Sequence, residues 1–184
     1  MKTMVKTIFL FLVSQISHAQ GVMDIALKNK PLLIEESAFE IKEIMSSLNV
    51  TFVNEEFHII DKPLLDDLKL QSEKEQKSSW KKSDFKNRIL IRQNEKISLD
   101  SIKEVANSLN KEQKKLLTEQ IKSYNANEVL YRGFPIKISK PVYSSDRRFA
   151  VVGFSKGNNG GEIVLYKLVG EKWREENVLK RWAY

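Results

Sequence analysis

The chain of 184 residues contains no cysteine. This absence excludes disulfide bonds, thiol catalysis, cysteine metal sites and lipid attachment through a cysteine. Long hydrophobic runs are also missing, because the most apolar stretch, residues 8–16, is far shorter than the roughly 20 residues that a membrane-spanning helix needs. Stability must therefore come from an apolar core, and a chain in which 41% of the residues are hydrophobic can form one.

The motifs of phosphate-binding and calcium sites are absent as well. The chain has no Walker loop and no alternating-aspartate calcium loop. A G-x-S-x-G match at Gly153–Gly157 lies in the glycine-rich segment, which joins two strands instead of leading into a helix as a nucleophile elbow does. After the N-terminal segment 1–19 the only histidine is His58, which lies close to Glu55 and Glu56. A histidine beside carboxylates can act as a general base or a metal ligand, but a zinc site here would need three carboxylate or water ligands, an unusual set. We therefore predict no catalytic residue, no metal and no cofactor.

Three adjacent pairs of acidic residues are the remaining candidates for chemistry: Glu35–Glu36, Glu55–Glu56 and Asp66–Asp67. Glycoside hydrolysis uses two carboxylates about 5–10 Å apart across a groove. Adjacent side chains point to opposite faces of a strand and diverge by about 100° on a helix. Adjacency therefore argues against shared chemistry, and we interpret the pairs as solvated surface charges.

The N-terminal segment 1–19 has the pattern of a cleavable signal peptide. A start with two lysines is followed by the short apolar run and by the small-residue site Ser17-His18-Ala19. We expect cleavage before Gln20 and export to the periplasm or the medium, with no stable membrane anchor afterwards. The alternative is a buried or interfacial N-terminal helix. Residues 20–184 have the size of one ordinary domain and are predicted to form a single one.

Capping signals predict several helices. Asn110 and Gln113 form a capping box, in which each side chain satisfies an otherwise unpaired backbone N–H, and apolar residues at helical spacing follow. Ser98 begins the preceding helix, so that the two abut as a helical hairpin. Ser37 and Glu40 form another capping box and predict a helix from this point.

The other N-terminal segments have weaker signals. Asp61-Lys62-Pro63 indicates a short helix, because proline is tolerated in a first helical turn. Residues 22–27 and 32–34 are expected to form one or two short helical turns. Residues 50–60 are expected to form one or two short strands.

Residues 69–87 are the most polar stretch of the chain. They are interpreted as a solvated helix face or a mobile loop, fixed to the core by Trp80 and Phe85. Residues 89–91, Ile-Leu-Ile, are predicted to form a strand.

The hydrophobic period changes from helical to two near residue 134. The predicted strands cover residues 134–138, 149–154 and 163–169 and a last segment that contains Trp173. Turn residues separate them, which is typical of an antiparallel meander. The fold class is therefore α+β, with N-terminal and central helices packed on a mainly C-terminal antiparallel sheet.

Three short motifs mark the last quarter of the chain: Ser139-Lys140-Pro141-Val142-Tyr143-Ser144, Gly160-Gly161-Glu162 and Lys172-Trp173. With a strand between the first two, this pattern resembles the C-terminal meander of small exported proteins of unknown function from Gram-negative bacteria. The resemblance implies export and a helix-plus-sheet domain, and it carries over no catalytic residue. Many of those proteins have cysteines in the glycine loop, where this chain has Asn158 and Asn159, so a loop disulfide is missing.

Charge is unevenly distributed along the chain, whose net charge is +7. Residues 20–68 hold 4 basic and 10 acidic side chains, residues 69–96 hold 9 and 4, and residues 132–184 hold 11 and 5. Such asymmetry can mark an electrostatic binding face. Alternatively, the acidic first segment lies against the basic last one, which is the interpretation we favour. Nucleic acid is a poor candidate partner, because an exported protein meets little of it and no binding motif is present.

Candidate binding residues lie at the end of the chain. The glycine-rich loop joins two strands instead of leading into a helix, so it favours a hairpin connection over a phosphate cradle. A loop at a sheet end is a usual place for a binding surface, which makes Asn158 and Asn159 candidates. The aromatic residues of the sheet are expected in the core, whereas Trp182 and Tyr184 are candidates for an exposed contact.

These observations favour a non-enzymatic periplasmic or secreted binding domain that uses the sheet and its glycine loop against a protein or cell-envelope partner. An immunity-type protein that masks an exported toxin is one version. The alternative is a cell-envelope hydrolase that acts on glycans or peptides through carboxylates, with or without His58. A third interpretation is the carriage of a lipid or small ligand between helices and sheet.

Overall fold

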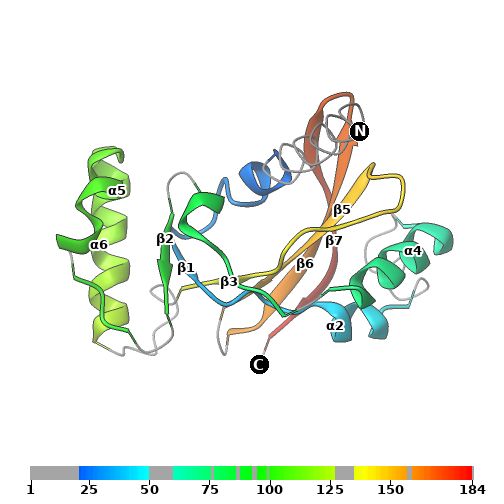
Figure 1. The fold of residues 1–184 in the computed structure, drawn as a ribbon, viewed down its shortest axis with the longest axis horizontal. Helices are drawn as coiled ribbons and strands as arrows, with labels where there is room; N and C mark the ends of the chain where they lie inside the picture. The colour runs from blue at the N-terminus through cyan, green and yellow to red at the C-terminus, as the bar shows by residue number, and fades with distance from the viewer. Residues whose placement is uncertain are drawn as a thin grey trace, which may run out of the picture.

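The computed structural model describes residues 21–49, 60–75, 77–85, 88–92, 95–98, 100–126, 135–156 and 159–183. The helices are a helical segment over residues 21–26, α2 (Lys42–Ser47), α4 (Lys62–Glu73), the 3-10 helices η1 (Lys82–Asp84) and η2 (Asp100–Ile102), α5 (Lys103–Asn107) and α6 (Lys111–Asn125). The strands are β1 (Leu33–Glu35), β2 (Ile89–Ile91), β3 (Lys137–Ile138), β4 (Val142–Tyr143), β5 (Phe149–Ser155), β6 (Gly161–Val169) and β7 (Lys172–Trp182). Helices lie mostly before the sheet in the chain (Figure 1), so the predicted α+β class is confirmed.

The larger sheet has the order β3-β5-β6-β7, and β4 also pairs with β5. Strands β5, β6 and β7 follow one another antiparallel, so the predicted meander is confirmed. The turn between β6 and β7 contains Gly170 at a φ of 62°, a left-handed conformation that glycine adopts without strain. The sequence does not predict strand β4, because two residues are too few to show a hydrophobic period of two.

The smaller sheet consists of β1 and β2, which pair in parallel. The prediction of a helical turn at residues 32–34 is therefore wrong: this apolar run is a strand whose partner is distant in the sequence, with Leu33 opposite Ile89. Ile136 joins β1 on its other side, since its N–H donates to the Leu33 carbonyl at 3.2 Å and its carbonyl accepts from the N–H of Glu35 at 2.9 Å. The backbone pairing thus continues from β3 through β1 to β2.

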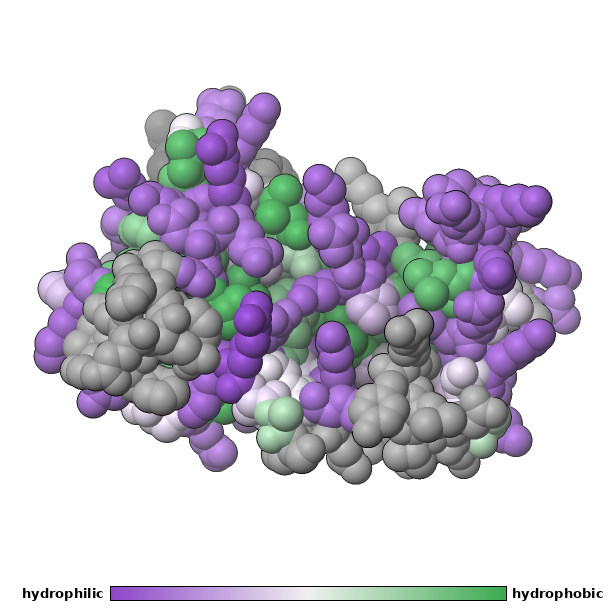
Figure 2. All heavy atoms as spheres, turned by 180° about the vertical axis from the view of Figure 1, so that it is seen from behind, coloured by the Kyte–Doolittle hydropathy of each residue, from purple (hydrophilic) through white to green (hydrophobic). Residues whose placement is uncertain are grey.

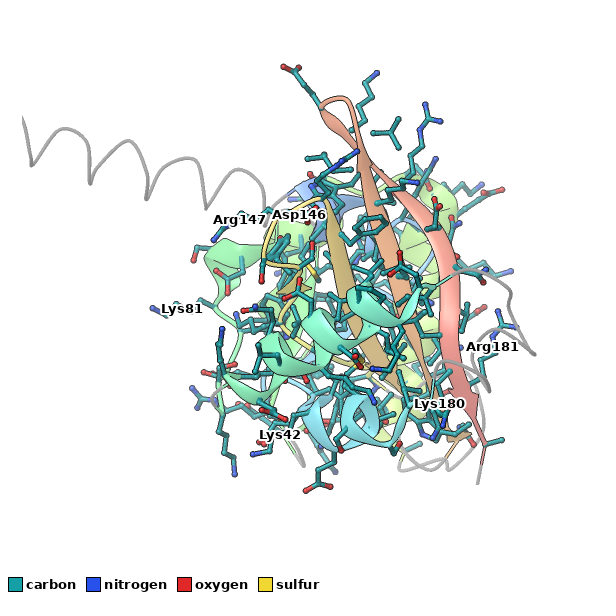
Figure 3. All side chains as sticks on the ribbon, turned by 90° about the vertical axis from the view of Figure 1, so that its right-hand side faces the viewer. Lys42, Lys81, Asp146, Arg147, Lys180 and Arg181 are labelled. Atoms are coloured by element: carbon teal, nitrogen blue, oxygen red, sulfur yellow. The ribbon has the colours of Figure 1, made fainter. Side chains whose placement is uncertain are left out.

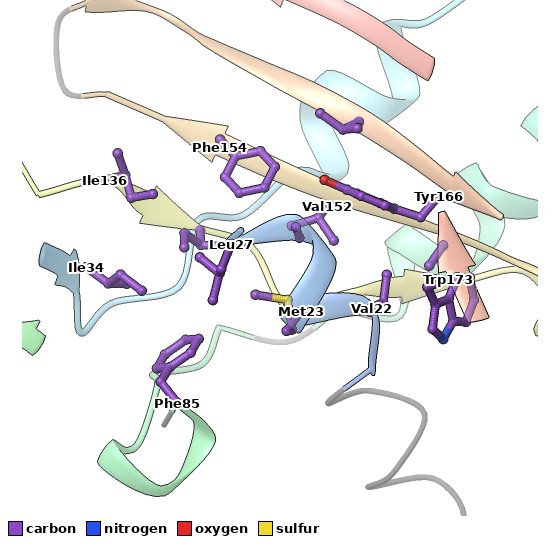
Figure 4. Close-up of a cluster of buried hydrophobic side chains, with 14 of the residues drawn as sticks. Val22, Met23, Leu27, Ile34, Phe85, Ile136, Val152, Phe154, Tyr166 and Trp173 are labelled. Atoms are coloured by element: carbon purple, nitrogen blue, oxygen red, sulfur yellow. The ribbon is translucent and has the colours of Figure 1, made fainter. Parts of the chain in front are cut away.

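The hydrophobic core has three parts. Because successive residues of a strand point to opposite faces of the sheet, the larger sheet contributes to two of these parts. One face of the larger sheet carries Val152, Val164 and Tyr166, which pack with the helical segment over residues 21–26 (Figure 4). The opposite face carries Val151 and Leu165, which pack with α2 and α4. The third part lies between the β1–β2 pair and the helices α5 and α6. Seen from behind, the surface is mostly hydrophilic, with separate apolar patches (Figure 2).

The helix predictions have mixed outcomes. At α6 the predicted capping box forms, with the Gln113 N–H donating to Asn110 at 2.9 Å and the Asn110 N–H to Gln113 at 3.1 Å. The prediction at Ser37 is wrong, because its hydroxyl donates to the Glu35 carboxylate and α2 begins only at Lys42, without a side-chain cap. At Ser37, sheet pairing competes with the capping signal for the same segment.

Other local predictions are confirmed in the described residues. Asp61 caps α4 by accepting a hydrogen bond from Leu64 N–H at 2.8 Å, and the helix continues to Glu73 through part of the polar stretch. Trp80 and Phe85 are buried, as expected for residues that fix this stretch to the core. Of the segment 50–60, where strands are predicted, all but the last residue is outside the described ranges. No helix in the described part is long and apolar enough to span a membrane.

Candidate functional site

A groove of about 690 Å³ runs along the outer side of β2, and we call it the β2 groove. It is lined by β2 with its flanking residues, by the segment that leads into η1, and by residues before and within η2 and α5. These are residues 79–82, 88–92 and 95–97 together with Glu36, Ile102 and Val105. The groove therefore lies where the backbone pairing ends, between two segments that are distant in sequence.

The β2 groove combines apolar walls with positive charge. Ile97, Ile102 and Val105 supply apolar surface. The charged lining is five cationic and two acidic side chains, an excess of three positive charges: Lys81, Lys82, Arg88, Arg92, Lys96, Glu36 and Glu95. All five cations come from the basic stretch at residues 69–96.

The arginines of the groove are held in place by the neighbouring structure. The Arg92 guanidinium donates to the Glu36 carboxylate at 2.8 Å, and this contact raises the pKa of Arg92. Arg88 donates to the Leu27 carbonyl at 2.6 Å, and burial lowers the pKa of its guanidinium. An arginine remains charged in proteins at neutral pH, so both contribute positive charge.

The segment that leads into η1 is tied to the larger sheet. The indole N–H of Trp80 donates to the Ile138 carbonyl at 2.9 Å, and the Lys140 ammonium lies 3.5 Å from the centroid of the Trp80 ring. Lys140 also pairs with Asp84 at 3.2 Å, and Asp84 accepts from the Lys81 N–H at 2.9 Å. These contacts fix the backbone that carries the exposed side chains of Lys81 and Lys82.

The outer edge of β2 has backbone groups that do not pair with β1. Ile89 donates to Leu32 at 2.9 Å, and the Ile91 carbonyl accepts from the Glu36 N–H at 2.8 Å. Because residues of a strand alternate between its two neighbours, the N–H and C=O of Leu90 point away from β1. In the described part of the chain no other backbone group pairs with them.

The residues predicted from the sequence lie elsewhere. Asn159 and Trp182 lie at the same end of the larger sheet, because Gly161, two residues after Asn159, pairs with Trp182. Neither residue lines the β2 groove. Trp182 is partly buried and packs on Phe39 with ring centroids 6.0 Å apart. In Figure 3, the neighbouring Lys180 lies on β7, on the opposite side of the molecule from Lys81. Asn158, Tyr184 and His58 are outside the described residues.

The acidic pairs diverge as the sequence predicted, but Glu35 is buried, so its interpretation as a solvated surface charge is wrong. Glu35 pairs with Lys137 at 3.1 Å, whereas Glu36 pairs with Arg92. Asp66 pairs with Lys62, whereas Asp67 accepts from the N–H of Ser145. The Glu55–Glu56 pair is outside the described residues. Within the described ranges no group of three or more histidines and carboxylates could hold a metal ion.

A second, smaller hollow of about 420 Å³ lies between α4 and the turn that joins β4 to β5. Its three cations have partners within the fold: Lys74 donates to Gln71 at 3.0 Å, Lys140 pairs with Asp84, and Arg147 lies over the Tyr143 ring. Burial raises the pKa of the Glu75 carboxyl, which lines the same hollow. The β2 groove is larger and has the greater excess of positive charge.

Comparisons with protein-family models, with curated proteins and with solved structures gave no match. The β2 groove is therefore interpreted from its own residues. The signal for it in the sequence is the excess of basic residues between positions 69 and 96, next to the apolar run of β2. The sequence alone does not reveal a groove here, because other parts of its lining come from Glu36 and from α5, which lie outside this basic stretch.

Proposed function

We propose that this protein is a non-enzymatic binding domain whose β2 groove holds an acidic segment of a partner protein. The observation that carries the proposal is the convergence of five cations on a groove with apolar walls. A positive groove attracts an acidic partner and orients it, and apolar contact then contributes affinity. This choice moves the binding site from the glycine loop, where the sequence alone suggested it, to the basic stretch.

The proposal includes a location outside the cytoplasm. Its support is the leader-like pattern of the N-terminal segment 1–19, with Lys2 and Lys6 ahead of the apolar run. An immunity-type protein that masks an exported toxin is one version, in which the acidic segment belongs to the toxin. Mass spectrometry of the protein from the periplasm should give a chain that begins at Gln20, whereas an intact Met1 in the cytosol would contradict the location.

The peptide that tests the groove is a fluorescein-labelled alternation of glutamate and valine, with a lysine–valine alternation for comparison. Fluorescence anisotropy with the mature chain should show binding of the acidic peptide only. The double variant Lys81→Glu/Lys96→Glu, which reverses two exposed charges of the groove, should weaken this binding by about tenfold or more.

The matched control is Lys156→Glu/Lys172→Glu, which changes the net charge by the same amount at exposed positions outside the groove. This variant should bind within about twofold of the native protein, because its substitutions leave the lining of the groove unchanged. Equal losses in the two variants would mean that only net charge matters, and tight binding of the lysine peptide would contradict the proposal outright.

The competing hydrolase needs two carboxylates that face each other across a groove. In the described residues the two members of each acidic pair have different partners, which supports binding over hydrolysis. His58 is tested by its replacement with alanine and an assay on peptidoglycan fragments. Hydrolysis by the native protein that disappears in His58→Ala would favour the enzyme and overturn the binding domain.

A further inference from the structure

We infer that the acidic segment binds as an extended strand that adds to the outer edge of β2. This inference rests on the proposed function, since it concerns the same groove and the same acidic partner. It specifies more: the partner contributes backbone hydrogen bonds as well as charge, and one residue position lies opposite Leu90.

The backbone pairing leaves the outer edge of β2 without a partner strand in the described part of the chain. Strand β1 is occupied on both sides, by β2 and by Ile136, so the pairing ends at β2. The N–H and C=O of Leu90 point outward from this last strand, and β2 lines the groove. An added strand would exchange two hydrogen bonds with Leu90, as a residue does with its antiparallel neighbour.

The composition of β2 also suits the addition of a strand. Exposed edge strands usually carry charges, irregular pairing or proline, which prevent unwanted strand addition. Strand β7, which is the last strand of the larger sheet, fits this rule, with exposed Arg174, Glu175 and Glu176 and two register shifts against β6. Strand β2 is Ile-Leu-Ile, so its three residues include no charge and no proline. An apolar edge in the floor of a groove is suited to a strand that covers it.

The charged residues on either side of Leu90 suit an acidic strand. Arg88 and Arg92 are two residues before and after it, so the three side chains alternate onto one face of the extended segment. Both arginines line the groove. The Arg92 carbonyl already accepts from the N–H of Glu95 at 3.1 Å and from the Tyr124 hydroxyl at 3.2 Å, so strand pairing stops there.

These positions define the segment that the edge accepts. An apolar residue lies opposite Leu90, and acidic residues two positions on either side face Arg88 and Arg92, because residues i and i+2 of a strand share a face. The pattern is Glu-x-Val-x-Glu, in a short extended stretch of the partner.

The experiment uses the fluorescein-labelled peptide Glu-Thr-Val-Thr-Glu with flanking glycines and two N-methylated forms. Methylation of the valine amide removes the donor that faces Leu90 and blocks close approach of the strands, so affinity should fall by about tenfold or more. The matched control carries the methyl group on the threonine before the valine, whose N–H faces away from β2, and should bind within about twofold of the parent peptide.

The second measurement is amide hydrogen exchange of the full mature protein with and without the parent peptide. The N–H of Leu90 should exchange at least about tenfold more slowly in the complex, because strand addition gives it an acceptor. Equal affinities of the two methylated peptides, or unchanged exchange at Leu90, would overturn strand addition. If strand addition fails in this way but binding is still weakened by Lys81→Glu/Lys96→Glu, the proposed function stands. A parent peptide that does not bind at all would contradict both the proposed function and strand addition.

Discussion

At the scale of single residues, the Ser139-Lys140-Pro141 motif has a structural role. The Ser139 hydroxyl is fully buried and accepts from the Gly153 N–H at 2.8 Å, while the Ser139 N–H donates to the Gly153 carbonyl at 2.9 Å. Lys140 covers the Trp80 ring. The motif therefore connects β3 to β4 along one edge of β5 and fixes one wall of the β2 groove.

Glycine is needed at position 161 because neighbouring atoms lie too close to the backbone for any side chain to fit. A Cβ atom there would lie 2.2 Å from the Phe154 carbonyl oxygen and 2.3 Å from the Trp182 ring. We expect Gly161→Ala to lower the free energy of unfolding by about 3 kcal/mol, measured by urea denaturation, because backbone cannot move aside. The control is Gly170→Ala, where nothing lies within 4 Å and only the positive φ costs stability, about 1 kcal/mol. A larger loss at Gly170 would contradict this explanation.

Glu75 gives the fold a pH dependence. Burial raises the pKa of its carboxyl above the ordinary 4.5, so the folded protein holds this proton more tightly than the unfolded chain does. Protonated Glu75 therefore stabilises the folded state relative to the unfolded chain. This contribution is fully present below pH 4.5 and is lost as the pH rises through the folded-state pKa of Glu75. Glu75→Gln should therefore be more stable than the native protein at neutral pH, and the difference should shrink in acid. Urea denaturation at several pH values tests this, with the exposed Glu73→Gln as control.

At the scale of elements, the accuracy of prediction depends on the distance between partners in the chain. The α6 cap joins residues three apart, and the meander joins strands through short turns, so both are visible in the sequence. The β1–β2 pair joins Leu33 to Ile89, and no local pattern reveals it. The pairing also prevents a helix at Ser37, because this residue bridges to Ser79.

The α6 cap offers a direct test of a local signal. Asn110→Ala removes the side chain that accepts from Gln113 N–H, and we expect a loss of about 1 kcal/mol in the free energy of unfolding. Thr118→Ala lies in the same helix and removes a hydroxyl bound to the Lys114 carbonyl without removing a cap. This control should be neutral or slightly stabilising, because alanine is the better helix former. Thermal unfolding that shifts equally in both variants would show that the cap is not the cause.

At the scale of the whole molecule, the acidic and basic segments partly neutralise one another. Glu35 pairs with Lys137 and Glu36 with Arg92, so the acidic first segment contacts basic residues of both later segments. Lys81 and Lys96 have exposed side chains and line the groove. The interpretation that the acidic first segment lies against basic residues therefore holds for Glu35 and Glu36, whereas the electrostatic binding face belongs to our proposal.

This exposure predicts a salt dependence for the proposed binding. Affinity for the glutamate–valine peptide should fall by about tenfold between low salt and roughly 0.5 M sodium chloride, because ions screen solvent-exposed charges. Anisotropy titrations at several salt concentrations measure the slope. The slope should flatten in Lys81→Glu/Lys96→Glu and stay unchanged in Lys156→Glu/Lys172→Glu. Affinity independent of salt in the native protein would show that charge does not drive binding.

The sequence by itself determined the α+β class, the α6 cap and the three-stranded meander, because these depend on contacts between near neighbours in the chain. Tertiary structure decided that residues 33–35 pair with residues 89–91 and that Trp182 packs on Phe39. It also placed the cations of residues 81–96 around one groove. Such sites join segments far apart in the chain, and their geometry follows from how the whole core packs.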